Sequence, residues 1–278
     1  MNKMMNKILP IVREAGEMAL EFEKRLPALR QIDKKGQGIA TQADEEIEKF
    51  LIKKLKTIKE AIFLAEESHF KTGETSFEKY KKENVWMIDP IDGTNNFLNK
   101  IPFYSVSVGY VENEEAQIGV VYNPRLRECF FAQKGKGAYY FENIDEEPIA
   151  ISNLKNSKSV SESIVSLGFL ASKKRELEQD YNKFMKLLRG TRATRKFGSA
   201  ALDLCYVAID RIDIYHEYFL KPWDLAAATV ICQESGVILS NHNSQNYSVF
   251  GPHILAAKEP LYSTTNDYLN SFDENDLV

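Results

Sequence analysis

The sequence predicts a layered α/β fold that contains an antiparallel section in its first half. Between residues 104 and 141, four short apolar runs are separated by turn residues, which is typical of an antiparallel meander. From residue 163 onward, short apolar runs alternate with helical patterns, which is typical of a sheet covered by helices. The chain has 278 residues, of which 44% are hydrophobic, so it is long enough to bury a large core.

Two amphipathic helices are expected before the first strand. From Met4 to Glu23 apolar residues recur at helical spacing, and Pro27 ends the pattern. Residues 34–38 form a basic turn with two glycines, either a mobile loop or a solvated charged turn. Thr41 and Asp44 then begin a second helix, because a hydroxyl followed by acids satisfies the free N–H groups of a first turn. Asp44 is either a plain acid at that helix start or a group aimed at a reacting water.

The next apolar run, Ala61 to Ala65, is expected to be a buried strand that leads directly into Glu66 and Glu67. Ligands in layered α/β folds collect at the carboxyl ends of strands, so these two acids are candidate site residues. Residues 69–84, rich in lysine, are expected to form an exposed connection.

The following stretch is the most informative one. Val85 to Ile88 predict a buried strand, and Asp89-Pro90 is expected to stop it because proline lacks the N–H of a continuing ladder. Gly93-Thr94 suits a helix N-terminus, where backbone N–H groups and the helix dipole favour an anion such as phosphate. Asp89 and Asp92 would crowd each other unless a cation lay between them. The pattern indicates a hard divalent metal between acids and a phosphate, and the alternative is an ordinary type I turn with an Asp N-cap.

The whole chain is expected to be one domain in two parts, residues 1–150 and residues 151–278. Residues 142–160 form the joint between them. The expected strands of the meander cover residues 104–111, 116–122, 129–132 and 138–141. The second part is expected to contain strands at 163–167, 193–196, 213–217, 237–239 and 254–257, and helices at 175–188, 198–208, 221–235 and from Pro260.

Composition excludes several classes of protein. A net charge of -4 and a pI near 5.8 give no basic footprint, so we expect neither nucleic acid nor an anionic membrane as a partner. The three cysteines, Cys129, Cys205 and Cys232, lie in apolar runs and are expected to be buried free thiols, which favours a cytoplasmic location. Charged residues interrupt the apolar N-terminus, and no long uncharged apolar run could span a bilayer. The four histidines lack zinc-site spacing.

Acids beside turn residues come from both halves of the chain, and hard oxygen ligands of this kind favour magnesium. They are Asp44, Glu66, Glu67, Asp89, Asp92 and Asp224.

Together with their surroundings, these acids resemble the inositol monophosphatase family of the fructose bisphosphatase superfamily. The resemblance covers nearly the whole chain, because several separate blocks occur in the family's order. They are Thr41–Asp44, Ala65–Ser68, Trp86–Phe97, Ile101–Phe103, Gly119–Pro124, Lys134–Ala138, Gly198–Leu204 and Trp223–Ala227.

The resemblance implies an αβαβα sandwich, often a homodimer, that hydrolyses inositol monophosphate or a similar small sugar or polyol phosphate. Its expected cofactor is about two to three Mg²⁺ ions, with Mn²⁺ as an alternative. The implied metal ligands are Glu66, Asp89, the carbonyl of Ile91, Asp92 and Asp224. The implied catalytic residues are Asp44 and Thr94, which position the attacking water, with Glu66 and Glu67. Backbone N–H groups of Gly93 and Thr94 would hold the phosphate, and Ser199, Ala200, Glu217, Asp92 and Asp224 would meet the substrate. Lithium sensitivity is a further implied trait.

Some implied roles have plain alternatives. Glu217 is alternatively a surface acid at a strand end, and Glu67 alternatively holds only Glu66 or an outer water. Arg195 and Lys196 either contact a second phosphate or are solvated, with solvation favoured. Ala65 stands where the family commonly has glycine, which requires a negative φ there. His216 stands where an aromatic residue is commoner.

Rival activities within the superfamily are fructose bisphosphatase, histidinol phosphatase and 3'(2'),5'-bisphosphate nucleotidase. Asn95-Asn96 favours the inositol phosphate branch over the nucleotidase branch, which typically has Lys-Glu there. A rival of another class is a regulatory protein that binds protein or RNA partners, as some bacterial relatives are thought to do.

Overall fold

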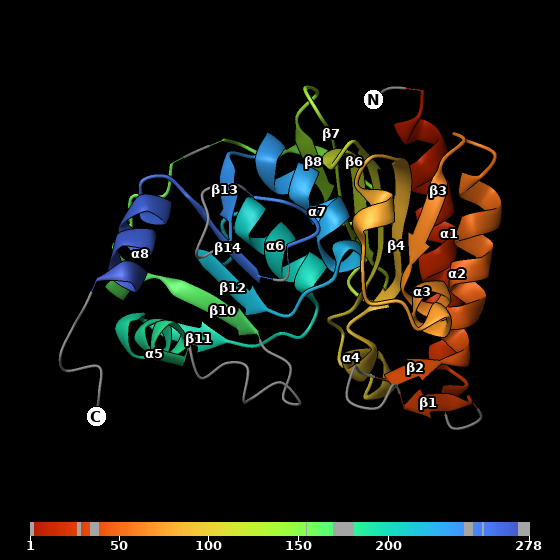
Figure 1. Cartoon of the computed structure of the whole chain (residues 1–278), viewed down its shortest axis with the longest axis horizontal. Coiled ribbons are helices and arrows are strands. Elements are labelled where there is room, and N and C mark those ends of the chain that lie inside the picture. The colour runs from red at the N-terminus through yellow and green to blue at the C-terminus, as the bar shows by residue number, and fades with distance from the viewer. Residues whose placement is uncertain are drawn as a thin grey trace.

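The computed structural model describes residues 3–26, 29–33, 39–153, 155–168, 181–241, 247–251 and 253–271. Pro27, the basic turn at 34–38 and the first part of the helix expected at 175–188 lie outside these residues. Five layers follow one another in space: a helical layer, a five-stranded sheet, a pair of helices, a seven-stranded sheet and a second helical layer (Figure 1). This arrangement confirms the expected αβαβα sandwich.

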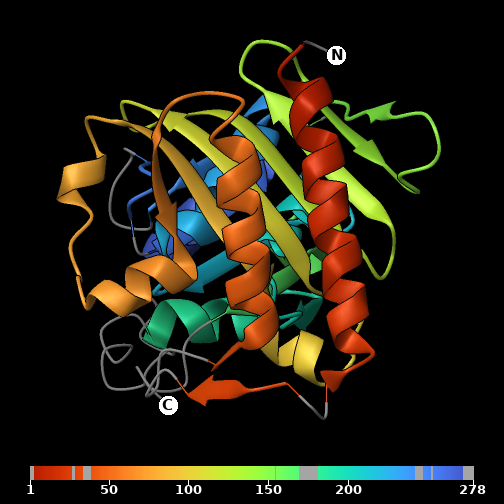
Figure 2. The same ribbon diagram turned by 90° about the vertical axis from the view of Figure 1, so that its right-hand side faces the viewer.

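The outermost layer on the N-terminal side consists of two helices that lie side by side across one face of the larger sheet (Figure 2). They are α1 (Met5–Glu23) and α2 (Gln42–Leu55). Their buried stripes, which include Ile8 and Val12 on α1 and Ile47 and Leu51 on α2, pack on that sheet. A short antiparallel pair, β1 (Gln31–Asp33) and β2 (Ile39–Thr41), connects them.

The larger sheet has the strand order β3-β4-β5-β6-β7-β8-β9, and all of its pairs except β3–β4 are antiparallel. The meander is therefore confirmed. Its strands are β3 (Ile62–Ala65), β4 (Asn84–Asp92), β5 (Ser105–Glu112), β6 (Glu115–Asn123), β7 (Glu128–Gln133), β8 (Ala138–Phe141) and β9 (Ile149–Ala150).

One expectation about this half was wrong, and the structure adds detail to two others. Pro90 does not stop β4, because the register of β4 against β5 shifts between Asp89 and Asp92 and a bulge needs no N–H from the proline. Residues 149–150, within the expected joint, also form the last strand of this sheet, β9. Residues 69–84 form a mostly exposed connection, as expected, but they include part of α3 (Glu66–Thr72) and the short helix η2 (Glu78–Tyr80), and His69 packs among aromatic rings there.

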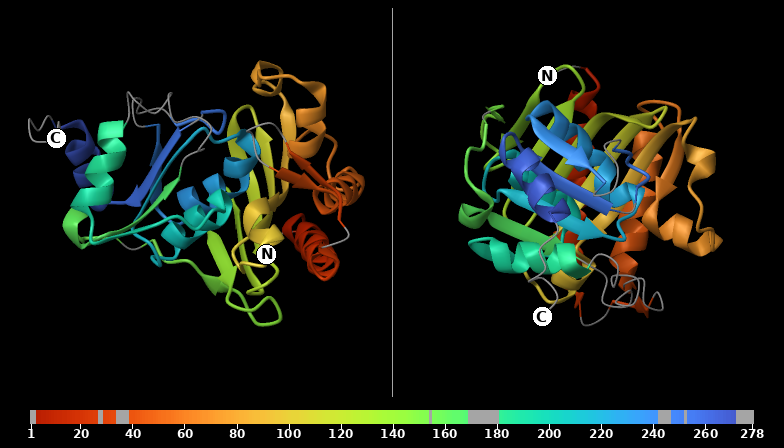
Figure 3. Two further views of the ribbon diagram at one scale, coloured as in Figure 1. Left: turned by 90° about the horizontal axis from the view of Figure 1, so that it is seen from below. Right: turned by 60° about the vertical axis from the view of Figure 1, so that its left-hand side comes forward.

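The middle layer consists of α6 (Ala200–Ala208) and α7 (Pro222–Glu234), which lie between the sheets in the views of Figures 1 and 3. Two glycines let α7 approach the larger sheet. A Cβ built on Gly109 would lie 2.7 Å from the Cβ of Ala226, and one built on Gly119 would lie 2.0 Å from the carbonyl oxygen of Ala227. The helix backbone therefore rests directly on the sheet.

The smaller sheet has the order β11-β10-β12-β14-β13, in which β10 pairs parallel with β11 and β12. Two helices, α5 and α8, cover its outer face (Figure 3). The elements are η3 (Val160–Glu162), β10 (Ile164–Gly168), α5 (Tyr181–Gly190), β11 (Ala193–Arg195), β12 (Ile214–Tyr218), β13 (Val237–Ser240), β14 (His253–Lys258) and α8 (Leu261–Asn270).

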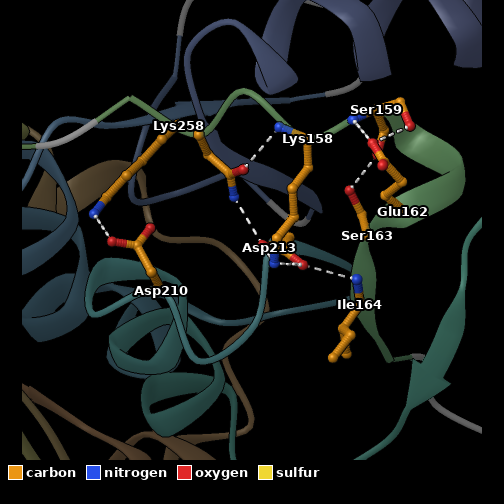
Figure 4. A network of polar contacts seen from close by, with 9 residues as sticks. Lys158, Ser159, Glu162, Ser163, Ile164, Asp210, Asp213 and Lys258 are labelled. Carbon is orange, nitrogen blue, oxygen red and sulfur yellow. Dashed lines mark hydrogen bonds and ion pairs between the residues drawn. The ribbon is translucent and has the colours of Figure 1, made fainter.

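The segment that joins the two sheets is tied to the smaller one by a polar network (Figure 4). Asp213, which is buried, accepts hydrogen bonds from the Lys158 ammonium at 2.7 and 3.0 Å, from the Asn156 amide at 2.8 Å and from the Ile164 N–H at 2.9 Å. Lys258, also buried, pairs with Asp210 at 2.8 Å. Because buried charges need partners, the bonds from Asn156 and Lys158 to Asp213, and the bond from Lys258 to the Ser152 carbonyl at 3.4 Å, hold the joint in one position.

The three cysteines are free and buried, as expected. In the part of the chain that the structure describes, none of the helices combines the length and the apolar character needed to cross a bilayer.

Candidate active site

The centre of the candidate site is the bulge at the end of β4. The N–H of Ile91 donates to Asp89 at 3.0 Å, and Asp89 pairs with Ser107 while Asp92 pairs with Ser105 on β5. Two residues of β4, Pro90 and Ile91, thus lie opposite one residue of β5, Val106, so the ladder is irregular between Asp89 and Asp92. Both carboxylates are nearly inaccessible to solvent, with 3% and 6% of their surface exposed.

A sharp turn follows this bulge. Gly93 has a φ of +93°, a conformation that residues with a Cβ rarely adopt, and it precedes the short helix α4 (Thr94–Leu98). The Thr94 hydroxyl lies 3.1 Å from the carbonyl oxygen of Ile91 and 3.4 Å from a carboxylate oxygen of Asp44. The structure therefore brings Thr94 to Asp44, the two residues expected to position a water.

Asp44 is held in place by the N-cap of α2. It accepts hydrogen bonds from the N–H of Thr41 at 2.8 Å and from the Thr41 hydroxyl at 2.6 Å. The Thr41 hydroxyl in turn accepts from the N–H of Ala43. Thr41 and Asp44 thus form the capping box that the sequence predicted, and one oxygen of Asp44 remains directed toward Thr94.

Asp92 joins the two halves of the site. Its carboxylate accepts from the Ser199 hydroxyl and from the N–H groups of Ala200 at 3.2 Å and Ala201 at 2.9 Å, at the beginning of α6. Burial raises the pKa of Asp92 to about 6, although the bonds from Ser199, Ala201 and Ala200 act in the opposite direction. In this structure Ser199 and Ala200 contact Asp92, while their expected contact with a substrate stays a prediction.

The remaining acids lie at helix starts near the bulge. Glu66 is the first residue of α3, and Asp224 lies in the first turn of α7, where it accepts from the N–H of Lys221 at 2.7 Å. Burial raises the pKa of Asp89, and the charges of Glu66, Asp92, Asp224 and Asp44 raise it further. Burial, Asp92 and Glu66 likewise raise the pKa of Asp224. The acids from both halves therefore share one electrostatic environment.

The donor set is suitable for a hard cation. It consists of carboxylate oxygens and the Ile91 carbonyl, without the sulfur or imidazole ligands that favour softer metals. As the side chains stand, no three acids, histidines or cysteines among the described residues are close enough to enclose an ion. The acids therefore lie around the bulge but do not form a complete coordination site as they stand. The Asp92 carboxylate instead points toward the start of α6.

Two residues that support the site were missed from the sequence. Glu48 accepts from the N–H groups of Glu67 at 2.7 Å and Ser68 at 2.9 Å, so it caps α3, whose first residue is Glu66. Its position four residues after Asp44 on the buried stripe of α2 was an available signal, because an acid on an apolar face requires a partner.

The second missed residue is Asn96. Its amide nitrogen donates to the carbonyl of Phe103 at 2.6 Å and to that of Phe197 at 2.7 Å. Asn96 thus ties the turn that carries Thr94 to the loop that precedes Ser199. No local pattern indicates these partners, since Phe197 lies 101 residues away.

At the substrate side, Glu217 lies on β12, and Tyr215 donates a hydrogen bond to it. Burial raises the pKa of Glu217 to about 7, while the bond from Tyr215 and the charge of Lys196 lower it.

The residues on either side of Glu66 are placed as follows. Ala65 has a φ of −125°, the negative value that its place before Glu66 required. Glu67, the second residue of α3, is buried, with 2% of its surface exposed.

The layered sandwich and the acids gathered at its strand bulge are features of a family of phosphatases. A model of the inositol monophosphatase family matches residues 3–273, and the chain belongs to that family.

Its relatives carry more than one name. The chain is 30% identical over 258 residues to the Nus factor SuhB of Pasteurella multocida, with 92% of each chain covered. It is 32% identical over 244 residues to the inositol-1-monophosphatase of Synechocystis sp., covering 87% of this chain and 80% of that one. The solved structure of the Thermotoga maritima IMPase superposes with a TM-score of 0.77 at 26% identity, with 96% of each chain covered.

Proposed function

We propose that the protein is a Mg²⁺-dependent phosphomonoesterase that hydrolyses inositol monophosphate or a similar small sugar or polyol phosphate. The observation that carries this proposal is the placement of the Asp44–Thr94 pair beside the gathered acids and the Gly93 turn. We further propose that it acts as a homodimer, as the family resemblance implies, and in the cytoplasm, as its buried free cysteines favour.

The residues that would hold magnesium are Glu66, Asp89, the Ile91 carbonyl, Asp92 and Asp224. Bound magnesium would supply positive charge that activates a water and stabilises the leaving oxygen. Without such charge, the acids raise one another's pKa, so binding a cation would relieve a repulsion that folding creates. Glu67, buried behind Glu66, would support this ligand.

The chain itself would orient the attacking water and receive its proton. Thr41 holds one oxygen of Asp44, which leaves the other to accept a hydrogen bond from Thr94 or a proton relayed through it. The N–H groups of Gly93 and Thr94, at the start of α4, would bind the phosphate oxygens. Glu217, Ser199 and Ala200 would contact the hydroxyl groups of the substrate. Asp92 and Asp224 would both bind the metal and contact the substrate.

A panel of phosphate esters tests the proposal. Phosphate release from myo-inositol monophosphate, fructose bisphosphate, histidinol phosphate and adenosine 3',5'-bisphosphate would be measured with Mg²⁺, with Mn²⁺ and after chelation. We expect Mg²⁺-dependent release that is fastest from the inositol ester. Turnover that persists after chelation, or no turnover on any ester, would reject the proposal, and a faster reaction on another ester would assign that rival activity instead.

The name Nus factor SuhB among the relatives favours a second candidate, a regulatory role through a bound partner. The variant Asp92→Asn separates the two candidates. If that variant releases no phosphate yet restores a strain that lacks the gene, the partner-binding role is supported. If it does not restore the strain, the required role depends on the active site.

A further inference from the structure

The carboxyl group of Glu217 occupies space that a neighbouring strand leaves free. β10 and β12 are parallel, and Gly168 is the register partner of Glu217. A Cβ built on Gly168 would lie 2.0 Å from the carboxyl carbon of Glu217 and 2.1 and 2.3 Å from its two oxygens. Any side chain at position 168 would therefore displace the carboxyl group.

The orientation of Glu217 is set by a second neighbour. Tyr215 and Glu217 are two residues apart on β12, so their side chains point to the same face of the sheet. The Tyr215 hydroxyl donates to Oε2 of Glu217, and the tyrosine is completely buried. A buried phenol that donates to a carboxylate restricts the rotation of both groups.

A third titratable group, Asp203, interacts electrostatically with this pair. Asp203 on α6 is buried, with 2% of its surface exposed, and it accepts from the Ser166 hydroxyl at 2.9 Å. Burial raises the pKa of Asp203 and the charge of Glu217 raises it further, while burial and the charges of Glu217 and Asp203 raise the pKa of Tyr215. Burial and the two carboxyl groups therefore oppose ionisation of the phenol, which keeps Tyr215 a hydrogen-bond donor.

We propose that Tyr215 and Gly168 are positioning residues that make the site specific for phosphate esters with a hydroxyl group remote from the phosphate. They hold Glu217 in one orientation, in which its remaining oxygen accepts a hydrogen bond from that hydroxyl. This inference rests on the proposed function. It goes beyond that function because it assigns substrate selection to residues that do not themselves contact the substrate.

The test compares two esters that differ in the recognised group. Steady-state kinetics with Mg²⁺ would be measured on myo-inositol monophosphate and on phenyl phosphate, which has no hydroxyl to bind. For Tyr215→Phe we expect KM for the inositol ester to rise about tenfold, with kcat within about twofold and no change on phenyl phosphate. Gly168→Ala is expected to produce the same selective loss.

Two further variants make the result specific. Tyr206→Phe removes another phenol-to-carboxylate bond, to Glu128 at 2.9 Å, and should leave both KM values unchanged. In the background of Glu217→Gln, the additional change Tyr215→Phe should have little further effect, because its action passes through Glu217. This comparison keeps the inference testable even if Gly168→Ala does not fold.

The outcomes distinguish the inference from the function on which it rests. An active wild type whose Tyr215→Phe variant loses both esters equally, or loses neither, overturns the inference alone. A full effect of Tyr215→Phe in the Glu217→Gln background also overturns it. A wild type that releases phosphate from neither ester overturns the proposed function, and the inference with it.

Discussion

The two walls of the candidate site are held in different ways. The wall from the first half, formed by the β4 bulge, Gly93 and the cap of α2, is held largely by bonds between near neighbours, such as those from Ile91 to Asp89 and from Thr41 to Asp44. The wall from the second half, formed by α6, α7 and β12, depends on distant pairs. Ser166 and Asp203 are 37 residues apart in the sequence. Gly168 and Glu217 are register partners on the adjacent strands β10 and β12.

The difference indicates a division of labour. Short-range bonds fix Asp89 and Asp44, although Thr94 reaches Asp44 from 50 residues away. On the second wall, the short-range bond from Tyr215 to Glu217 is combined with the long-range approach of Gly168. Asp92 connects the walls, because it is the last residue of β4 and its carboxylate accepts hydrogen bonds from the start of α6. Changes in the second wall should therefore alter specificity while the reaction itself persists, and changes at the connection should impair both.

The largest effect is expected at that connection. Asp92→Asn removes a proposed metal ligand and weakens the bonds to Ser199 and Ala201, so turnover on inositol monophosphate should fall at least about a hundredfold. The exposed change Asp267→Asn on α8 is the control and should have no effect. Normal kinetics of Asp92→Asn would remove Asp92 from the mechanism and leave the two walls without their proposed link.

The next largest effect is expected at Asn96, which ties the walls together through backbone carbonyls. Asn96→Asp replaces the donating amide with a carboxylate that faces two carbonyl oxygens, so the free energy of unfolding should fall by about 3 kcal/mol and turnover should fall with it. Asn99→Asp is a matched control, because the Asn99 amide donates only to the exposed carbonyl of Asn95 at 2.8 Å. Denaturant titration and phosphate release measure both quantities. Equal behaviour of the two variants would show that the walls do not need this tie.

A pH dependence is expected from the second wall. The pKa of Glu217 is raised from 4.5 to about 7 on folding, so between these pH values the unfolded chain loses its proton first. This contribution favours the folded state below about pH 4.5 and is lost as pH rises to about 7, with a magnitude of up to about 3 kcal/mol. Glu217→Gln should flatten the profile of unfolding free energy against pH over that range. An unchanged profile would show that Glu217 titrates normally.

The smallest effect is expected at Glu48. Glu48→Gln weakens the cap of α3, which should cost about 1 kcal/mol of stability and reduce the apparent affinity for Mg²⁺ through Glu66. The exposed neighbour Glu46 provides the control variant Glu46→Gln. A loss of stability without any change in the Mg²⁺ titration would restrict Glu48 to a structural role.

The same contrast explains what could be predicted from the sequence. The cap at Thr41, the turn at Gly93 and the meander were predictable because their causes lie within a few residues. Asn96 and Tyr215 were not recognised, since the partners and surroundings that give them a role come from other parts of the fold. Pro90 was misread because a proline ends a regular strand but is accommodated in a bulge, and only the register of β5 reveals the bulge.

The contact of α7 with Gly109 and Gly119 has a consequence for how this protein could diverge. The helix lies close to the sheet because Gly109 and Gly119 have no Cβ atom at the two contact points. Because Asp224 lies in the first turn of α7, an alanine at either glycine would lift the helix and move that carboxylate away from β4. The spacing of the acidic cluster is thus adjustable from the strands beneath the helix, at positions that a search confined to the active-site residues would not sample.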